Sequence, residues 1–292
     1  MPRPVAAVLV LALSVPGLSA VALPAAAAPH EVRQWEKVFP TRGRPALVLR
    51  CDDASVHVTT WERPAVGIRV TTRGWALGAR NVSVDASQSG DQVHCVVSEP
   101  HAYQFFQINF RSMRVDVSLP RDADVDVMTG DGSIVLAPLT GEIRAHSGDG
   151  AIEADGLRGR LSLSTGDGHI RAEDLDGSLV ARSGDGSIRL DGRFERLEVS
   201  TSDGRVTAVA RDGSRLASDW DLHSGDGSLT LRVPATLQAD LDLRTGDGSL
   251  TVGLPVQASG RFERRSLFGR LNGGGPVLRM TSGDGAIRLE KL

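Results

Sequence analysis

Eight aspartates recur in nearly the same local sequence, and these carboxylates at a fixed spacing are the side chains best placed to do chemistry. Each lies in a Ser/Thr-Gly-Asp-Gly tetrapeptide, with Ser202 replacing the first glycine in one copy. The first five are 18 residues apart, and the later steps are 23, 21 and 37 residues. The eight are Asp131, Asp149, Asp167, Asp185, Asp203, Asp226, Asp247 and Asp284. A column of them would suit calcium, which takes carboxylate and carbonyl oxygens.

A structural role at chain corners competes with calcium binding. Calcium β-rolls repeat Gly-Gly-x-Gly-x-Asp every nine residues, whereas this chain has one Gly-Asp-Gly per 18 residues. At a corner, aspartate accepts backbone N–H bonds and glycine supplies a positive φ. The Ser or Thr two residues before each aspartate has the parity of the inward-facing residues and would hydrogen-bond along its own column. We therefore expect structural corners, no metal and no cofactor, with a calcium-binding β-roll-like module as the alternative.

Cys51 and Cys95 are the only cysteines. In an oxidising compartment such a pair is usually bridged, so the sequence predicts a Cys51–Cys95 disulfide. Two buried free thiols are the alternative. Neither cysteine lies in a CxxC motif, so we expect no catalytic role.

The repeat is interrupted at residues 211–218 and 259–275. We expect the second interruption to be a looped-out rung, with a contact site for an acidic partner or a glycan as the alternative. Its candidate contact residues are Arg261, Phe262, Arg264, Arg265, Phe268 and Arg270. A carbohydrate-active enzyme is a third reading, because β-helix enzymes need carboxylates or bases converging in a groove. Neither interruption shows such a set, so we expect no enzymatic activity.

The elements that position the aspartates are indicated by the alternation of apolar and polar residues on both sides of each corner. Leu161 and Leu163 precede Asp167, Ile170 and Ala172 follow it, and the residues between them are polar. Period-two alternation predicts two short strands per repeat, each with one buried face. With a second corner, each repeat makes a rung of about 18 residues stacked about 4.8 Å from the next. The fold class predicted is all-β, a parallel β-solenoid of the single-stranded β-helix type. The step of 37 residues before Asp284 is interpreted as two rungs, one of them lacking its tetrapeptide.

The start of the chain differs in composition. Residues 1–28 combine Arg3, the apolar run 5–13 and small residues up to Ala28, which predicts a signal peptide. An uncleaved membrane anchor is the alternative, and no span is expected after cleavage. Residues 29–119 alternate less regularly and hold most of the aromatics, so we expect first coils or a β-rich cap. Residues 120–292 form the regular solenoid, continuous with those coils.

Composition narrows the function classes. The formal net charge is -3, aromatics make up 4% of residues, and 33 glycines suit a chain with many tight corners. No basic block or aromatic-basic platform is present, so nucleic acid is not an expected partner. The predicted location is extracytoplasmic, meaning periplasmic, at the cell surface or secreted.

The whole pattern resembles a known family. A β-rich first third, a junction at Val115-Asp116-Val117-Ser118-Leu119-Pro120, and Gly-Asp-Gly-Ser-Ile rungs are similar to the bacterial DUF4097 family, described as adhesins. The resemblance covers about residues 45–292. It implies a β-strand-repeat fold and a non-enzymatic scaffold for adhesion or binding, and it supplies no catalytic residues. The partner, a cell-surface glycan or protein, stays unidentified.

Overall fold

The computed structural model describes residues 32–78, 81–99, 112–258 and 264–292. Every described strand lies between Val32 and Lys291. The predicted signal segment, residues 1–28, lies outside the described residues. So do Arg261 and Phe262 of the predicted contact loop.

All regular elements of the described residues are strands, which confirms the all-β class. Their bounds are β1 Val32–Pro40, β2 Ala46–Cys51, β3 Ser55–Thr60, β4 Ala65–Arg73, β5 Ser83–Ser89, β6 Gln92–Ser98, β7 Ser112–Leu119, β8 Asp124–Thr129, β9 Ile134–Leu136, β10 Thr140–Ser147, β11 Ile152–Asp155 and β12 Arg158–Thr165. The series continues with β13 Ile170–Ser183, β14 Ile188–Thr201, β15 Val206–Ala210, β16 Trp220–Ser224, β17 Leu229–Val233, β18 Ala239–Thr245, β19 Leu250–Val252, β20 Gln257–Ala258, β21 Ser266–Leu271, β22 Val277–Ser282 and β23 Ile287–Lys291.

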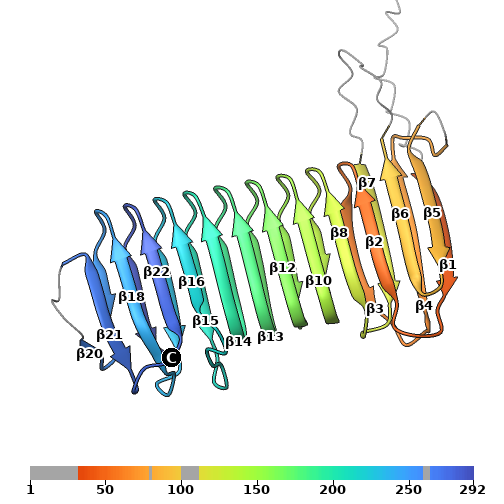
Figure 1. Ribbon diagram of the computed structural model, residues 1–292. Helices are drawn as coiled ribbons and strands as arrows, with labels where there is room; N and C mark the ends of the chain where they lie inside the picture. Colours follow the sequence, from red (N-terminus) through yellow and green to blue (C-terminus); the bar gives the residue numbers. More distant parts are fainter. Residues whose placement is uncertain (1–31, 79–80, 100–111, 259–263) are drawn as a thin grey trace, which may run out of the picture. The chain divides into compact units, whose positions relative to one another are not determined.

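Each rung places one strand on each of two walls. The first wall includes β2, β8, β10, β12, β16, β18 and β22, and the second includes β3, β9, β11, β15, β17, β19 and β23. The long strands β13 and β14 contribute to both walls. Figure 1 shows the strands of the rungs in a row, with the corners along one edge.

Neighbouring rungs of the repeat pair in parallel and in register. Ile143 of β10 lies opposite Leu161 of β12, and Ile152 of β11 lies opposite Ile170 of β13. The alternating apolar side chains point between the walls, where each of these four is at most 2% exposed. A solenoid-like fold is therefore confirmed, built from the alternation seen in the sequence.

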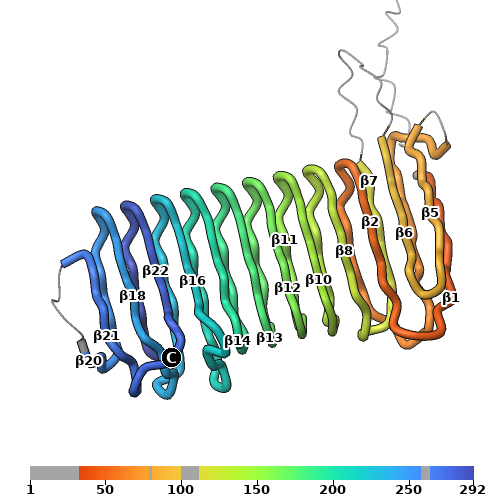
Figure 2. The backbone as a smooth tube through the Cα atoms, in the orientation of Figure 1, coloured from red at the N-terminus to blue at the C-terminus, as the bar shows by residue number. Residues whose placement is uncertain are grey.

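The order of rungs in space differs from their order in the chain. β22 pairs with both β16 and β18, and β23 pairs with both β17 and β19. The final rung is thus inserted between two earlier rungs, as the tube in Figure 2 shows in dark blue between lighter strands. The interpretation of the 37-residue step as two successive rungs is wrong. The chain passes the site of insertion, turns back through β21 and then fills the space.

The other end of the repeat contains a similar exchange. β2 pairs with β6 on one side and with β8 on the other, and β3 pairs with β7 and β9. The rung of β6 and β7 therefore lies outside the rung of β2 and β3, although it comes later in the chain.

Both ends of the solenoid finish in antiparallel strands. β4 runs antiparallel to β7 and β1, and β5 runs antiparallel to β6. At the opposite end β21 runs antiparallel to β18, and β20 pairs with β21. The solenoid is therefore mixed: parallel through the repeat and antiparallel where it ends. Parallel pairing runs through the repeat, as expected, but antiparallel strands at both ends depart from the expected parallel solenoid and interrupt its parallel edge.

Candidate functional site

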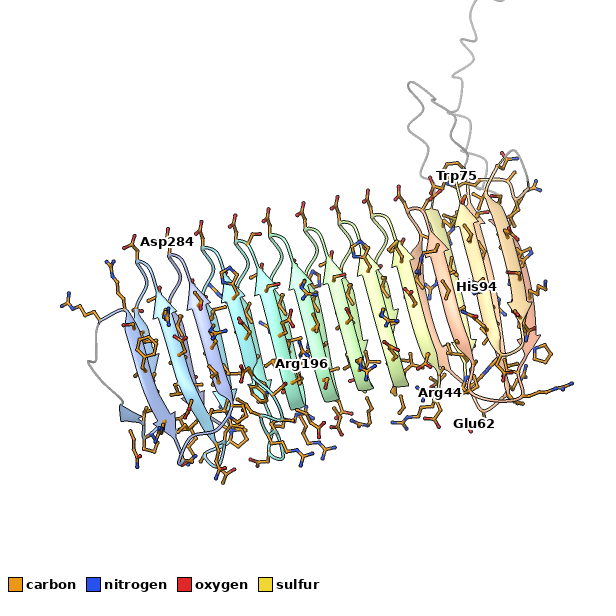
Figure 3. All side chains as sticks on the ribbon, in the orientation of Figure 1. Arg44, Glu62, Trp75, His94, Arg196 and Asp284 are labelled. Atoms are coloured by element: carbon orange, nitrogen blue, oxygen red, sulfur yellow. The ribbon has the colours of Figure 1, made fainter. Side chains whose placement is uncertain are left out.

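The eight predicted aspartates lie on one edge of the solenoid, and we call this edge the aspartate ridge. All eight are exposed. Because the last rung is inserted, Asp284 lies between the rungs of Asp226 and Asp247. Figure 3 labels Asp284 on this ridge, with side chains projecting from the neighbouring corners.

A ninth aspartate extends the ridge. Asp53 follows β2, and its Oδ1 accepts a hydrogen bond of 3.1 Å from the backbone N–H of Asp131. Sequence reasoning missed it, because its corner reads Asp52-Asp53-Ala54 without the flanking glycines. The available signal was the alternation of polar and apolar residues in Ser55-Val56-His57-Val58, which indicates a strand directly after this corner.

The Ser or Thr two residues before each aspartate is buried and forms a polar column behind the ridge. The hydroxyl of Thr165 donates to the carbonyl oxygen of Gly150 at 2.9 Å and accepts from the N–H of Gly168 at 3.2 Å. Ser147 and Ser183 repeat this pattern one rung away on either side. The hydroxyls therefore bond to backbone groups and not to one another along the column, and they tie each corner to a neighbouring one.

The corner glycines serve close approach, which corrects the expectation of positive φ. None of the Gly-Asp-Gly glycines lies in the positive-φ region; Gly141, Gly159 and Gly177 of the second corner do. A Cβ on Gly148 would lie 2.8 Å from the carbonyl oxygen of Gly130, and one on Gly150 would overlap the carbonyl oxygen of Gly132. Stacked corners leave no room for a side chain there.

The ridge offers few oxygens to a cation. Among the described residues, no three His, Cys, Asp or Glu side chains come together as a set that could hold a metal ion. The corner carbonyls already accept hydrogen bonds from the next rung, as Gly130 does from the N–H of Gly148 at 2.5 Å. The pKa of Asp131 is raised, mainly by repulsion from the carboxylate of Asp53, and further by burial and by repulsion from Asp149. The hydrogen bonds from the next rung give the corners a structural role.

The predicted disulfide is not formed. Cys51 and Cys95 are buried free thiols. In the parallel register of β2 and β6, Cys95 lies opposite Leu49 and Cys51 opposite Val97. The two cysteines are therefore diagonal neighbours, with Cα atoms about 8 Å apart from the strand spacing and rise, which is too far for a bridge. Burial raises the pKa of the Cys51 thiol and raises that of Cys95 to about 11.

The predicted contact residues that are described belong to β21 and the residues just before it. Arg265 forms an ion pair of 2.8 Å with Asp247, and Arg270 lies 3.8 Å from Asp240. The ring of Phe268 is 41% exposed, and the Arg244 guanidinium lies 4.9 Å from its centre. Arg264 is exposed. The segment is thus partly an antiparallel closing strand held by β18, which corrects the expectation of a looped-out rung.

The first interruption, residues 211–218, is also held by ion pairs. Arg211 pairs with Asp174 and Asp191, and Arg215 pairs with Glu195 at 2.7 Å. These contacts tie the interruption to the preceding rungs. The carboxylates of Asp174, Asp191 and Glu195 are thus paired with arginines.

The outer surfaces of the two walls differ in how their arginines are neutralised. On the first wall Arg50 pairs with Asp126 at 2.8 Å, and Arg279 lies 3.5 Å from both Asp221 and Asp242. On the second wall Arg171 pairs with Glu173 at 2.7 Å. Further along that wall, Arg189 and Arg288 have no ion pair within the part of the chain that the structure describes.

Comparisons with known proteins give a family and three distant structures. The family model described as Toastrack DUF4097 matches residues 46–290. No curated protein matches the chain. Among the described residues, no helix is long and apolar enough to cross a bilayer.

Three solved structures resemble the chain at low identity. A putative cell adhesion protein from Clostridium sporogenes is 11% identical, with 90% of this chain and 100% of that chain covered and a TM-score of 0.27. A putative lipid binding protein from Parabacteroides distasonis is 12% identical, with coverages of 88% and 96% and a TM-score of 0.48. A putative adhesin from Bacteroides fragilis is 9% identical, with coverages of 89% and 97% and a TM-score of 0.37.

Proposed function

The chain belongs to the Toastrack (DUF4097) family, and from this membership we propose that it is an exported, non-enzymatic scaffold that binds a partner at the cell surface or in the periplasm. The observation that carries the proposal is that the interior is filled by side chains of the chain itself, so that only the outer surfaces are free to bind a partner. The interior is filled by apolar side chains and by the Ser/Thr column of the corners. Contact with a partner is then left to the two outer walls and the aspartate ridge.

The regularity of the walls supports a binding role. Successive strands place side chains in straight columns, such as Arg144 opposite Ser162 and Ser162 opposite Val180. A surface fixed by a continuous hydrogen-bonded ladder keeps its shape, so a partner binds it without a large ordering cost. A glycan or a protein at the cell surface is the class of partner we propose.

Export is supported by the sequence of residues 1–28, whose apolar run 5–13 follows Arg3. The lack of an enzymatic role is supported by the carboxylate environments. The carboxylates beside the first interruption are paired with arginines, and those of the ridge stand on separate rungs.

The test combines location with binding. The full-length chain, tagged at its C-terminus, is produced in a bacterium, and intact cells, spheroplasts and lysates are treated with protease. We expect the protein in an extracytoplasmic fraction, with a mature N-terminus between Ala20 and Ala28. A matched variant carrying Val8→Asp and Leu11→Asp, which break the apolar run, should stay inside the cell.

Binding is then measured with protein purified after export. Saturable binding to cell envelopes of the producing bacterium, or of cells it adheres to, is the expected result. Recovery of the unaltered chain only from the cytoplasm, or purified protein that binds no envelope, would show the proposal to be wrong.

A further inference from the structure

The outer face of the second wall carries a column of arginines and threonines near its C-terminal end. Arg189, Thr207, Thr230 and Arg288 lie opposite one another on β14, β15, β17 and β23. Arg205 precedes Thr207 by two residues and Arg232 follows Thr230 by two, so both face the same way. We call the set of Arg189, Arg205, Thr207, Thr230, Arg232 and Arg288 the arginine–threonine strip.

The arginines of the strip are exposed and lack carboxylate partners. Among the described residues none of the four has a carboxylate oxygen within 4.0 Å; Arg205 donates to the hydroxyl of Ser228 at 3.1 Å. On strands of the first wall the arginines are paired. These are Arg50, Arg144, Arg158, Arg160, Arg182, Arg193, Arg196, Arg244, Arg270 and Arg279. The positive charge of the strip is thus available to a ligand.

The spacing of the strip follows from the sheet. Arg232 and Arg288 are diagonal neighbours on adjacent strands, and Arg205, just before β15, is placed in the same way beside Arg189, which gives about 8 Å between Cα atoms in each pair. Arg189 and Arg288 are three strands apart, or about 14 Å. A ligand that meets both pairs must therefore be an extended molecule with acidic groups at intervals.

Carboxylates near the strip restrict where such a ligand lies. Glu290 is opposite Arg232 in register without an ion pair within 4.0 Å. The aspartate ridge runs along the corner that precedes these strands, at Asp185, Asp203, Asp226 and Asp284. Repulsion by the ridge would keep an anion on the strip and align it across the strands.

We propose that the arginine–threonine strip binds an acidic polysaccharide whose chain runs along the solenoid. Guanidinium groups bind carboxylates through paired hydrogen bonds. The hydroxyls of Thr207 and Thr230, between the two arginine pairs, suit the hydroxyl groups of sugars. This inference rests on the proposed binding function and names the class of its partner.

The test measures binding of polygalacturonate to the folded protein, purified from whichever cell fraction contains it, with neutral dextran as the control polymer. A strip variant carries Arg189→Gln, Arg232→Gln and Arg288→Gln. A control variant carries Arg144→Gln, Arg182→Gln and Arg279→Gln, which make the same change in net charge on the first wall. Circular dichroism melts check that both variants are folded.

We expect the strip variant to bind polygalacturonate at least about tenfold more weakly, because it loses several charge-assisted hydrogen bonds. The control variant should stay within about twofold of the unaltered protein, and binding should weaken as salt rises. Equal losses in both variants, an unchanged strip variant, or equal binding to dextran would overturn the inference. Stronger binding to phosphatidylglycerol vesicles than to polygalacturonate would also overturn it, in favour of a lipid surface.

The two proposals fail separately. If the strip variant still binds cell envelopes as the unaltered protein does, the strip inference fails and the proposed function stands. If polygalacturonate binds at the strip but the chain stays in the cytoplasm, the proposed function fails instead.

Discussion

Gly150 lies directly against Gly132 of the preceding rung, so closely that a Cβ on Gly150 would overlap the carbonyl oxygen of Gly132. The same relationship holds between Gly168 and Gly150 and between Gly186 and Gly168. The glycines are therefore required by the stacking of the rungs themselves. Their backbone stays in regions open to any residue.

Substituting Gly150 by Ala should destabilise the protein by about 1–3 kcal/mol or more, because the added methyl group forces backbone atoms apart. Gly253→Ala is the matched control, since the nearest atom to its added Cβ is 3.8 Å away. Chemical denaturation of both variants gives the comparison. Equal unfolding midpoints would contradict the stacking explanation.

Thr165→Val should cost about 1–3 kcal/mol, because the N–H of Gly168 and the carbonyl oxygen of Gly150 lose the hydroxyl that they share. Thr207→Val, on the outer face of the second wall, removes a hydroxyl that contacts solvent and should be nearly neutral. Thermal melts measure the difference. A Thr165→Val protein as stable as the Thr207→Val protein would show that the column contributes nothing.

The rung order predicts which engineered cysteines form a disulfide. Thr230 lies opposite Arg288, and Thr251 lies opposite Arg288 on its other side. Thr230→Cys with Arg288→Cys should therefore oxidise, with Cα atoms about 4.8 Å apart. Thr230→Cys with Thr251→Cys, about 9.6 Å apart, should not. Peptide mapping without reductant decides, and the reverse result would mean that the rungs follow chain order.

The two natural cysteines should be inert in the folded protein. Burial raises the pKa of both thiols, that of Cys95 to about 11, so little thiolate is present at neutral pH. A thiol-reactive dye should label neither cysteine until denaturant is added, and then label both. Labelling or oxidation of the native protein at the rate seen in denaturant would contradict this prediction.

The same shift makes stability depend on alkaline pH. Unfolded thiols ionise near pH 8.5, whereas the Cys95 pKa in the folded state is about 11. The contribution of the Cys95 thiol to stability is therefore complete below about pH 8.5 and is lost as pH rises towards 11. Replacing both cysteines by valine should flatten the measured decline. A decline as steep as in the unaltered protein would assign it to other groups.

Calcium should leave the melting temperature unchanged. Calcium takes six to eight oxygen ligands, and the corner carbonyls beside the aspartates are already hydrogen-bonded to the next rung. Melts of the exported protein with excess EDTA and with added calcium provide the measurement. A clear rise with calcium, which mass action would require of a ligand that binds only the folded state, would restore the calcium alternative.

The sequence predicted the rungs because their signal is local. The alternation around Asp167 that placed Leu161, Leu163 and Ile170 inward holds in the structure, where each is at most 2% exposed. The burial of the Ser/Thr column was also predictable, because each Ser or Thr lies an even number of residues from the inward apolar residues of its strand. These features depend on a few adjacent residues and on a period that repeats unchanged.

The order of the rungs and the closing strands could not be predicted in this way. Successive rungs present similar apolar columns to each other, so the repeat pattern alone does not determine which rungs are neighbours. The order depends on segments outside the repeat, such as β21, whose antiparallel pairing with β18 turns the chain back. The diagonal placement of Cys51 and Cys95 likewise depends on the register of β2 with β6, which spacing alone does not reveal.

The inserted rung affects how the chain can be made. β22 and β23 emerge after β18 and β19 during synthesis, yet they occupy the space that joins those strands to β16 and β17. Simple winding from one end to the other cannot build this solenoid. The strands β18 and β19 join β16 and β17 only through residues made later, and such long-range closure slows folding. The last rung therefore completes the fold, and a chain that stops short of it leaves unpaired strand edges for proteases to recognise.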